Sequence, residues 1–433
     1  MNASSRLPGF YQLNSNERLR RVAEAVGLSD EEQAVLRQGG LDLALADSLV
    51  ENVVGLYSLP LAVAPNFTIN GRDVLVPMVV EEPSVVAAAS HAARLIRDGG
   101  GFTASHDEPL MMGQVQLLDV PDLDAAEAQV QAHTAELLHL ADQQLPSIVA
   151  RGGGARGVET RRLTSRVGPL LVVHIVLDVR DAMGANAVNT VAEALAPHLA
   201  RLTGGRPGLR ILSNLADHRL ARAACRVPHT SFDAQGIEGR AVVRGIVEAQ
   251  AFAEADSYRA VTHNKGVMNG VDAVVVATGN DWRAVEAAAH AWAARSGQYS
   301  PLTQWDQDAN GDLLGRLELP LALGIVGGTT RAHPVARLAL RILGVETAGD
   351  LAQVAACVGL AQNLGALRAL ATEGIQKGHM TLHARQMAVA AGATGDLAQR
   401  VADQLVAEGN IKVARAEELV KAMSSEKEVG SSR

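Results

Sequence analysis

The run DAMGAN at 181–186 has the composition and the setting of a turn that binds phosphate. It follows a β-branched apolar run at 170–179 and precedes apolar residues at helical spacing that continue to Gly204. A glycine-bearing turn between strand and helix points backbone N–H groups and the positive end of the helix dipole at an anion such as a dinucleotide pyrophosphate. Gly184 leaves room for that approach. An ordinary strand-to-helix connection looks the same, so both interpretations stay open here.

A second glycine run, GGGARG at 152–157, matches the dinucleotide-binding pattern letter for letter. No strand is predicted before it, and the residues after it read as strand rather than helix. The context is therefore wrong for a dinucleotide fingerprint, and the run predicts a loop or a hairpin connection.

Three polar residues lie next to predicted elements, and each has a structural explanation. Glu82 ends a predicted strand just before a helix, where carboxylates complement the helix dipole. Lys265, in HNKG, is predicted in a turn that precedes a buried strand at 271–278. Asp281, in TGNDW, is predicted to cap the helix that follows. Taken singly, none of these positions indicates catalysis.

The sequence predicts no metal site. HMTLH at 379–383 places two histidines four residues apart, but the zinc-protease pattern needs Glu after the first histidine, His379, and Met380 stands there. The two cysteines, Cys225 and Cys357, form no C-x-x-C motif. Their scarcity also fits a reducing compartment.

Composition limits the partners. The 433 residues carry 39 basic and 47 acidic side chains, for a net charge of −8, and no basic run with interleaved aromatics argues for nucleic acid. Residues 1–20 lack the apolar core of a signal peptide. The apolar stretch 351–370 is interrupted by polar side chains, so it predicts a buried helix rather than a membrane span. We expect a soluble, cytoplasmic protein.

The pattern of elements predicts an α+β fold. Helices are expected over 17–58, with Asn16 as a cap. A strand at 114–118, a helix at 123–143, strands from 158 to 179 and the helix after Asn186 predict a compact small α/β domain. The expected units are a large helix-rich domain formed by 1–109 and 218–374, a small inserted domain at 110–217, and a C-terminal helical unit at 375–433 with Gly374 and Gly378 as hinges.

Several motifs together resemble hydroxymethylglutaryl-CoA reductase, in particular the soluble class II enzymes of prokaryotes. The resemblance runs in one register from about residue 5 to beyond 385. The motifs are ENVVG (51–55), PSVVAAAS (83–90), DAMGAN (181–186), HNKG (263–266), TGNDW (278–282), GIVGGTT (324–330) and EGIQKGHMTLHAR (373–385).

The resemblance implies an activity and an architecture. The family interconverts hydroxymethylglutaryl-CoA with mevalonate and CoA by two hydride transfers. Its large domain binds the acyl-CoA, its small domain binds the nicotinamide nucleotide, and a C-terminal flap carries a histidine. The family also implies a homodimer or a larger assembly of dimers, with each site built between subunits. The direction, mevalonate synthesis or degradation, stays open.

The resemblance assigns four catalytic residues, which are Glu82, Lys265, Asp281 and His379. Glu82 would exchange protons near the reacting carbonyl, Lys265 would stabilise the oxyanion, and Asp281 would set their protonation. His379, with an ordinary pKa of about 6.5, would protonate the departing CoA thiolate. We expect Glu82, Lys265 and Asp281 to lie together.

The resemblance also implies binding residues. Ser84, Arg259 and Asn269 would hold the hydroxymethylglutaryl group, with Arg259 on its free carboxylate. The phosphate turn would be lined by Asp181, Met183, Gly184 and Asn186.

The choice of nucleotide depends on the residues around position 145. NAD-preferring relatives carry an aspartate that binds the adenosine ribose where this chain has Leu145, and Asp142 is the nearby acid. We predict NAD, with Asp142 in that role. Arg151 and Arg156 leave NADP as the alternative.

Two other interpretations compete with the reductase. The first is a different NAD(P)-dependent dehydrogenase with the same phosphate turn. The second is a non-enzymatic helical binding protein in which Glu82, Lys265 and Asp281 are caps and surface charges. Oxidation of reduced nicotinamide in the presence of hydroxymethylglutaryl-CoA separates them from the reductase.

Overall fold

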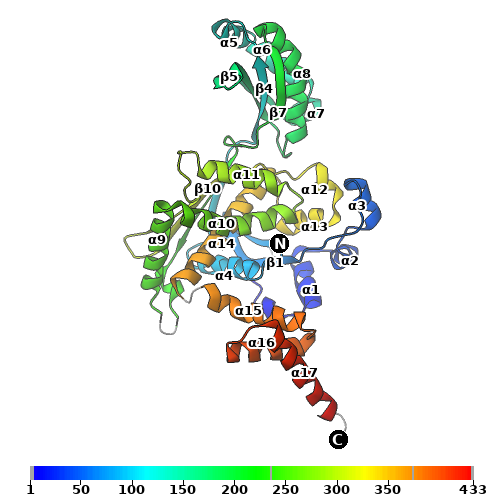
Figure 1. Cartoon of the computed structure of the whole chain (residues 1–433), viewed down its shortest axis with the longest axis vertical. Coiled ribbons are helices and arrows are strands. Elements are labelled where there is room, and N and C mark those ends of the chain that lie inside the picture. The colour runs from blue at the N-terminus through cyan, green and yellow to red at the C-terminus, as the bar shows by residue number, and fades with distance from the viewer. Residues whose placement is uncertain (1–3, 235–236, 373–374, 431–433) are drawn as a thin grey trace.

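The computed structural model describes residues 4–234, 237–372 and 375–430, and for 375–382 and 425–430 it describes the backbone only. Within these residues the chain forms two separate sheets, each with its own helices, and a group of C-terminal helices (Figure 1). The mixture of helices and sheets confirms the predicted α+β class.

The N-terminal segment contains a short 3-10 helix, η1 (Phe10–Gln12), and three helices, α1 (Ser15–Val26), α2 (Asp30–Gln38) and α3 (Leu43–Leu49). The predicted cap at Asn16 is wrong by two positions. The cap is Asn14, whose side chain accepts a hydrogen bond from the Glu17 N–H, while Glu17 accepts one from the Asn14 N–H. This reciprocal pair starts the helix earlier than the apolar periodicity indicates.

The large sheet has six strands in the order β2-β1-β3-β8-β10-β9. Neighbours are antiparallel except β1 and β3. The strands are β1 (Leu61–Ile69), β2 (Arg72–Val79), β3 (Phe102–His106), β8 (Leu220–Val227), β9 (Thr303–Gln307) and β10 (Leu313–Pro320). The helices around it are α4 (Val85–Asp98), α9 (Gly239–Ala255), α10 (Ser257–Ala277), α11 (Trp282–Ala293), α12 (Gly328–Ala332), α13 (Pro334–Leu343) and α14 (Ala348–Ala371), with the 3-10 helix η2 (His229–Phe232). One continuous apolar core joins the sheet to α4, α9, α10 and α14.

Helix α14 is the centre of this core. Among the described residues it is the one helix long and apolar enough to cross a membrane, and 67% of its most apolar window is buried inside the structure. Such burial is what a core helix shows, as the sequence predicts for this stretch.

The strand predicted at 271–278 is wrong. These residues form the second half of α10, a continuous helix of 21 residues, and Lys265 therefore lies inside a helix rather than in a turn. The second half of α10, from Gly266 to Ala277, has no exposed residue, so its sequence lacks the polar stripe that marks an amphipathic helix. A short β-branched apolar run then looks the same in a buried helix and in a buried strand.

The small sheet has four antiparallel strands in the order β5-β6-β4-β7. They are β4 (Leu110–Leu118), β5 (Gly154–Ser165), β6 (Gly168–Asp178) and β7 (Arg206–Leu212). The helix predicted over 123–143 is two helices, α5 (Leu123–Ala132) and α6 (Thr134–Gln143), which meet at His133. Helices α7 (Pro146–Val149) and α8 (Ala185–Thr203) complete this unit, which has its own apolar core. These elements run from Leu110 to Leu212, and the boundaries of the small domain at 110–217 stay a prediction.

The C-terminal helices are α15 (Ile375–Ala390), α16 (Gly395–Glu408) and α17 (Val413–Gly430). They form a separate apolar cluster at the end of the molecule opposite the small sheet (Figure 1). Gly374 lies outside the described residues, and Gly378 lies in the backbone of α15. The hinge role of both stays a prediction.

Candidate active site

Glu82 and Lys265 meet although 183 residues separate them. Glu82 lies between β2 and α4, and Lys265 lies in the first half of α10. The Lys265 Nζ donates to Glu82 Oε2 at 2.6 Å. Asn269, one turn further along α10, places its Nδ2 3.4 Å from the same oxygen. An ammonium and an amide thus converge on one carboxylate, and in the single chain 58% of the Lys265 side chain and 36% of the Glu82 side chain remain exposed.

Ser84 has an unusual conformation beside this pair. It precedes α4 in the left-handed region, with φ of +74°, and its side chain caps no helical N–H. Its Oγ is buried and has no hydrogen-bond partner within the described structure. A strained serine with an unsatisfied hydroxyl is a feature that binding sites retain and packing alone does not favour.

Arg259 lies in the first turn of α10, and its backbone N–H donates to the capping Asp256. The guanidinium is half-buried and has no carboxylate partner within the described ranges, and burial lowers its pKa. Such a cation suits the carboxylate of a bound molecule. His263, nearby on the same helix, is buried, and its Nε2 contacts Thr303 Oγ1 at 2.5 Å. Burial and the charge of Arg259 lower the pKa of His263 to about 4, so this histidine is neutral at pH 7 and serves packing.

Asp281 caps α11, as the sequence predicts. Its Oδ1 accepts from the N–H groups of Arg283 and Ala284 at 3.0 and 3.1 Å. In the described part of the chain Asp281 forms no ion pair with Lys265. The expectation that Glu82, Lys265 and Asp281 lie together within one chain is therefore not met. The Asn280 N–H donates to the Val275 carbonyl, which is ten residues or about 15 Å along α10 from Lys265. Because Lys265 lies in a helix rather than in a turn, α10 carries the chain away from it before Asp281 is reached.

The phosphate turn has the geometry that its sequence predicts. It connects β6 to the 19-residue α8, and Gly184, at φ of +102°, occupies the cap position. A Cβ there would lie 2.8 Å from a Val179 methyl group, so only glycine fits. No side chain caps the first N–H groups of α8. This helix end, which includes Met183 before it and Asn186 in its first turn, can receive an anion.

Asp181 has a different contact from the one predicted. Its Oδ1 accepts from the Ala348 N–H at 2.9 Å, at the start of α14, and its carbonyl accepts from the Ile325 N–H at 2.9 Å. The carboxylate therefore fixes the turn to the large unit. A direct contact with phosphate stays a prediction.

Asp142 supports the loop of the second glycine run. Its Oδ1 accepts from the Ala155 N–H at 2.7 Å, and Leu145 is buried. Arg156 forms an ion pair with Asp178, with 2.9 Å between Nη2 and Oδ2, whereas Arg151 is exposed. One oxygen of Asp142 is thus already used.

Other predicted and unpredicted features complete the site. His379 lies in α15, and its side chain is outside the described residues. Among the described residues no group of three or more His, Cys, Asp or Glu side chains could hold a metal ion.

Sequence reasoning missed Arg219, which is 5% exposed and donates to the carbonyls of Ala182 and Met183, both at 3.2 Å. No motif marks this residue.

The architecture matches that of class II 3-hydroxy-3-methylglutaryl-CoA reductases. A solved structure of the enzyme from Streptococcus pneumoniae aligns with a TM-score of 0.82 and 41% identity, covering 96% of this chain and 99% of that one. A second, described as bound to NADPH in open conformations, aligns with a TM-score of 0.82 and 44% identity over 84% and 99% of the two chains.

Sequence comparison gives the family directly. The model of hydroxymethylglutaryl-coenzyme A reductase matches residues 14–384. The 3-hydroxy-3-methylglutaryl-coenzyme A reductase of Archaeoglobus fulgidus is 51% identical over 98% of this chain and 95% of its own length. A probable reductase of Borreliella burgdorferi is 33% identical over 78% and 77%. The chain belongs to the hydroxymethylglutaryl-coenzyme A reductase family, whose activity it shares, and the two rival interpretations are not retained.

Proposed function

We propose that the protein interconverts hydroxymethylglutaryl-CoA with mevalonate and CoA in the cytoplasm, using NAD(H), with Glu82, Lys265, Asp281 and His379 as catalytic residues. The observation that carries the proposal is the contact of 2.6 Å between Lys265 Nζ and Glu82 Oε2, with Asn269 on the same oxygen. It places a proton carrier beside a cation that can hold an oxyanion.

The chemistry requires two reductions. When bound, the reduced nicotinamide supplies hydride to the thioester carbonyl carbon, which gives a hemithioacetal, and later to the aldehyde. Lys265 holds the negative oxygen that forms in each reduction, and Glu82 exchanges the proton on that oxygen. Between the reductions the C–S bond breaks, and His379 protonates the thiolate so that it does not add back.

The substrate would be held by the residues around the Glu82–Lys265 pair. Arg259, which lacks a carboxylate partner in the described structure, would bind the free carboxylate of the hydroxymethylglutaryl group. The unsatisfied Ser84 hydroxyl and the Asn269 amide would bind its oxygens.

The uncapped start of α8 fits the pyrophosphate of a nicotinamide nucleotide, and Gly184 leaves space for it. NAD is the proposed nucleotide, with Asp142 binding the adenosine ribose. NADP is the alternative, since the Streptococcus pneumoniae relative is described with NADPH.

Replacing Asp142 with alanine is expected to raise kcat/KM for NADPH relative to NADH by about tenfold, because a carboxylate at the ribose repels a 2′-phosphate. Asp142→Asn is the matched control, since it keeps an acceptor for the Ala155 N–H and removes only the charge. Both variants should shift the ratio if repulsion is the cause. A wild type that prefers NADPH would overturn the choice of NAD, and an unchanged ratio in both variants would remove Asp142 from the site.

Replacing His379 with glutamine is expected to abolish most hydroxymethylglutaryl-CoA reduction while the reduction of mevaldehyde keeps the greater part of its rate. The reason is that only thiolate departure needs the histidine proton. Steady-state rates for the two substrates test this. Equal losses in both would make His379 a binding or folding residue.

We further propose that the working form is a homodimer or a larger assembly of dimers, in which a second copy supplies Asp281 to the Glu82–Lys265 pair. The support is that α10 separates Asp281 from Lys265 within one chain, and that the pair is exposed. Large apolar side chains of the ENVVG region and of α10 are also exposed, with Val54 at 99%, Tyr57 at 90% and Tyr258 at 89%. Apolar surface of this kind is typical of an interface.

A further inference from the structure

On the basis of the proposed function, we propose that Arg219 and Asn280 are positioning residues that join the phosphate turn to the Asp281 loop, so that nucleotide and Asp281 are presented as one unit. Neither residue is proposed to touch a reacting atom.

Arg219 lies where the chain returns from the small sheet to the large one, directly before β8. Its Nη1 donates to the Ala182 and Met183 carbonyls of the turn, and its Nη2 donates to the Leu323 carbonyl. Burial lowers the pKa of Arg219 to about 10, so the guanidinium is still charged at neutral pH. A buried charged donor thus connects two carbonyls of the turn to the segment that follows β10.

Asn280 connects that same segment to Asp281. Its Nδ2 donates to the Gly324 carbonyl at 3.0 Å, and its Oδ1 accepts from the Gly324 N–H at 2.7 Å. Gly324 in turn lies directly on the phosphate turn, because a Cβ there would be 2.5 Å from the Met183 nitrogen. Two hydrogen bonds of the Asn280 side-chain amide therefore hold the residue before Asp281 to Gly324, which packs on the turn.

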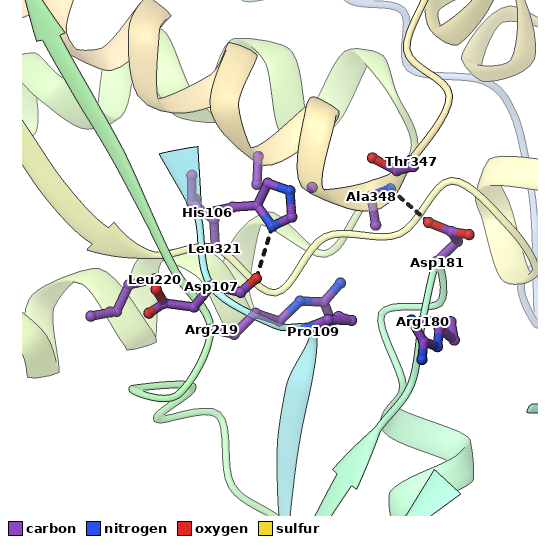
Figure 2. A pocket seen from close by; sticks show the side chains of 12 residues that line it. His106, Asp107, Pro109, Arg180, Asp181, Arg219, Leu220, Leu321, Thr347 and Ala348 are labelled. Carbon is purple, nitrogen blue, oxygen red and sulfur yellow. Dashed lines mark hydrogen bonds between the residues drawn. The ribbon is translucent and has the colours of Figure 1, made fainter. Parts of the chain in front are cut away.

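Asp181 gives the turn two further attachments to the large unit. Its carbonyl accepts from the Ile325 N–H, in the same segment that Arg219 and Asn280 contact, and its carboxylate accepts from the Ala348 N–H at the start of α14. The Ala348 contact lies beside a cavity of about 220 Å³ that is also lined by Arg219 and Pro109 (Figure 2). The large unit thus holds the turn from several directions. The separation between the bound nucleotide and Asp281 is then set inside one subunit, through Arg219, Gly324 and Asn280.

The test is a double-mutant cycle on nucleotide affinity, read by the fluorescence of bound NADH, with hydroxymethylglutaryl-CoA affinity measured in parallel. Arg219→Met and Asn280→Ala are each expected to raise the Kd for NADH by about tenfold. The first removes hydrogen bonds to the turn itself, and the second removes those that hold Gly324 against it. The double variant is expected to show about the same tenfold loss, because both residues act through one connection. The Kd for hydroxymethylglutaryl-CoA should stay within about twofold, which general destabilisation would not allow.

Two further variants keep the test decisive. Arg316→Met, an exposed arginine on the outer face of the same sheet, should leave both affinities unchanged. Arg219→Lys should recover part of the NADH affinity. A loss of NADH affinity of about a hundredfold in the double variant, the product of the two single losses, would overturn the inference and leave the proposed function standing. Equal losses of affinity for NADH and for hydroxymethylglutaryl-CoA would do the same. A wild type that bound no nicotinamide nucleotide would overturn the proposed function, and the inference with it.

Discussion

The variant Lys265→Met is expected to lose about 10²–10³ in kcat for hydroxymethylglutaryl-CoA reduction, which is the effect of removing one oxyanion donor from an enzyme site. Lys265 is the residue whose ammonium lies 2.6 Å from Glu82, and methionine removes the charge while it keeps an unbranched side chain only one atom shorter. Reduction of mevaldehyde should fall by a comparable factor, because each reduction creates a negative oxygen. Steady-state kinetics with the two substrates measure both.

The matched control is Lys412→Met, an exposed lysine before α17. It should change neither rate. A Lys265→Met enzyme within about twofold of wild type would show that Lys265 does not hold the oxyanion. A loss in the thioester step alone would limit its role to that step.

A dimer assembled from two inactive subunits is expected to regain about half of the wild-type activity. Lys265→Ala and Asp281→Ala chains carry different tags, and the mixed dimer is purified through both. Because two-fold symmetry gives two sites, one site of the mixed dimer receives both alanines and the other receives none. The prediction follows from the position of Asp281 at the far end of α10 from Lys265.

The control for this experiment is a mixed dimer of Lys265→Ala and Glu82→Ala chains. These residues contact each other within one chain, so each site of the mixed dimer has one defect and no activity should return. Absence of activity in the Lys265→Ala and Asp281→Ala dimer would show that Asp281 acts in its own subunit. Activity in the control dimer would contradict the placement of Glu82 with Lys265.

The small unit could be predicted well from the sequence because its signals are local. The strand before the turn, the glycine at the turn and the helix to Gly204 each occupy a continuous stretch, and the structure has them as β6, Gly184 and α8. The Asp281 cap is local in the same way. Periodicity and capping chemistry decide such elements before any tertiary contact is known.

The remaining errors come from tertiary contacts. The sequence of the second half of α10 predicts a strand because burial on most sides of this half removes the polar stripe. That single error also placed Lys265 in a turn, whereas the expectation that Asp281 lies beside it came from the family resemblance. Arg219 carries no sequence signal, since its function depends on three carbonyls that only the folded chain brings together. The contact between Glu82 and Lys265 is predicted from the family resemblance, because no spacing pattern relates two residues so far apart in the chain.

The stoichiometry of nucleotide oxidation tests the central claim most directly. Hydroxymethylglutaryl-CoA in limiting amount is mixed with the wild-type protein and excess NADH, and the near-ultraviolet absorbance of reduced nicotinamide is followed while mevalonate and free CoA are quantified. Two reduced nucleotides should be oxidised for each hydroxymethylglutaryl-CoA consumed, with one mevalonate and one CoA formed. Consumption of one nucleotide with release of an aldehyde, or no oxidation with either NADH or NADPH, would contradict the two-step reduction at the Glu82–Lys265 site.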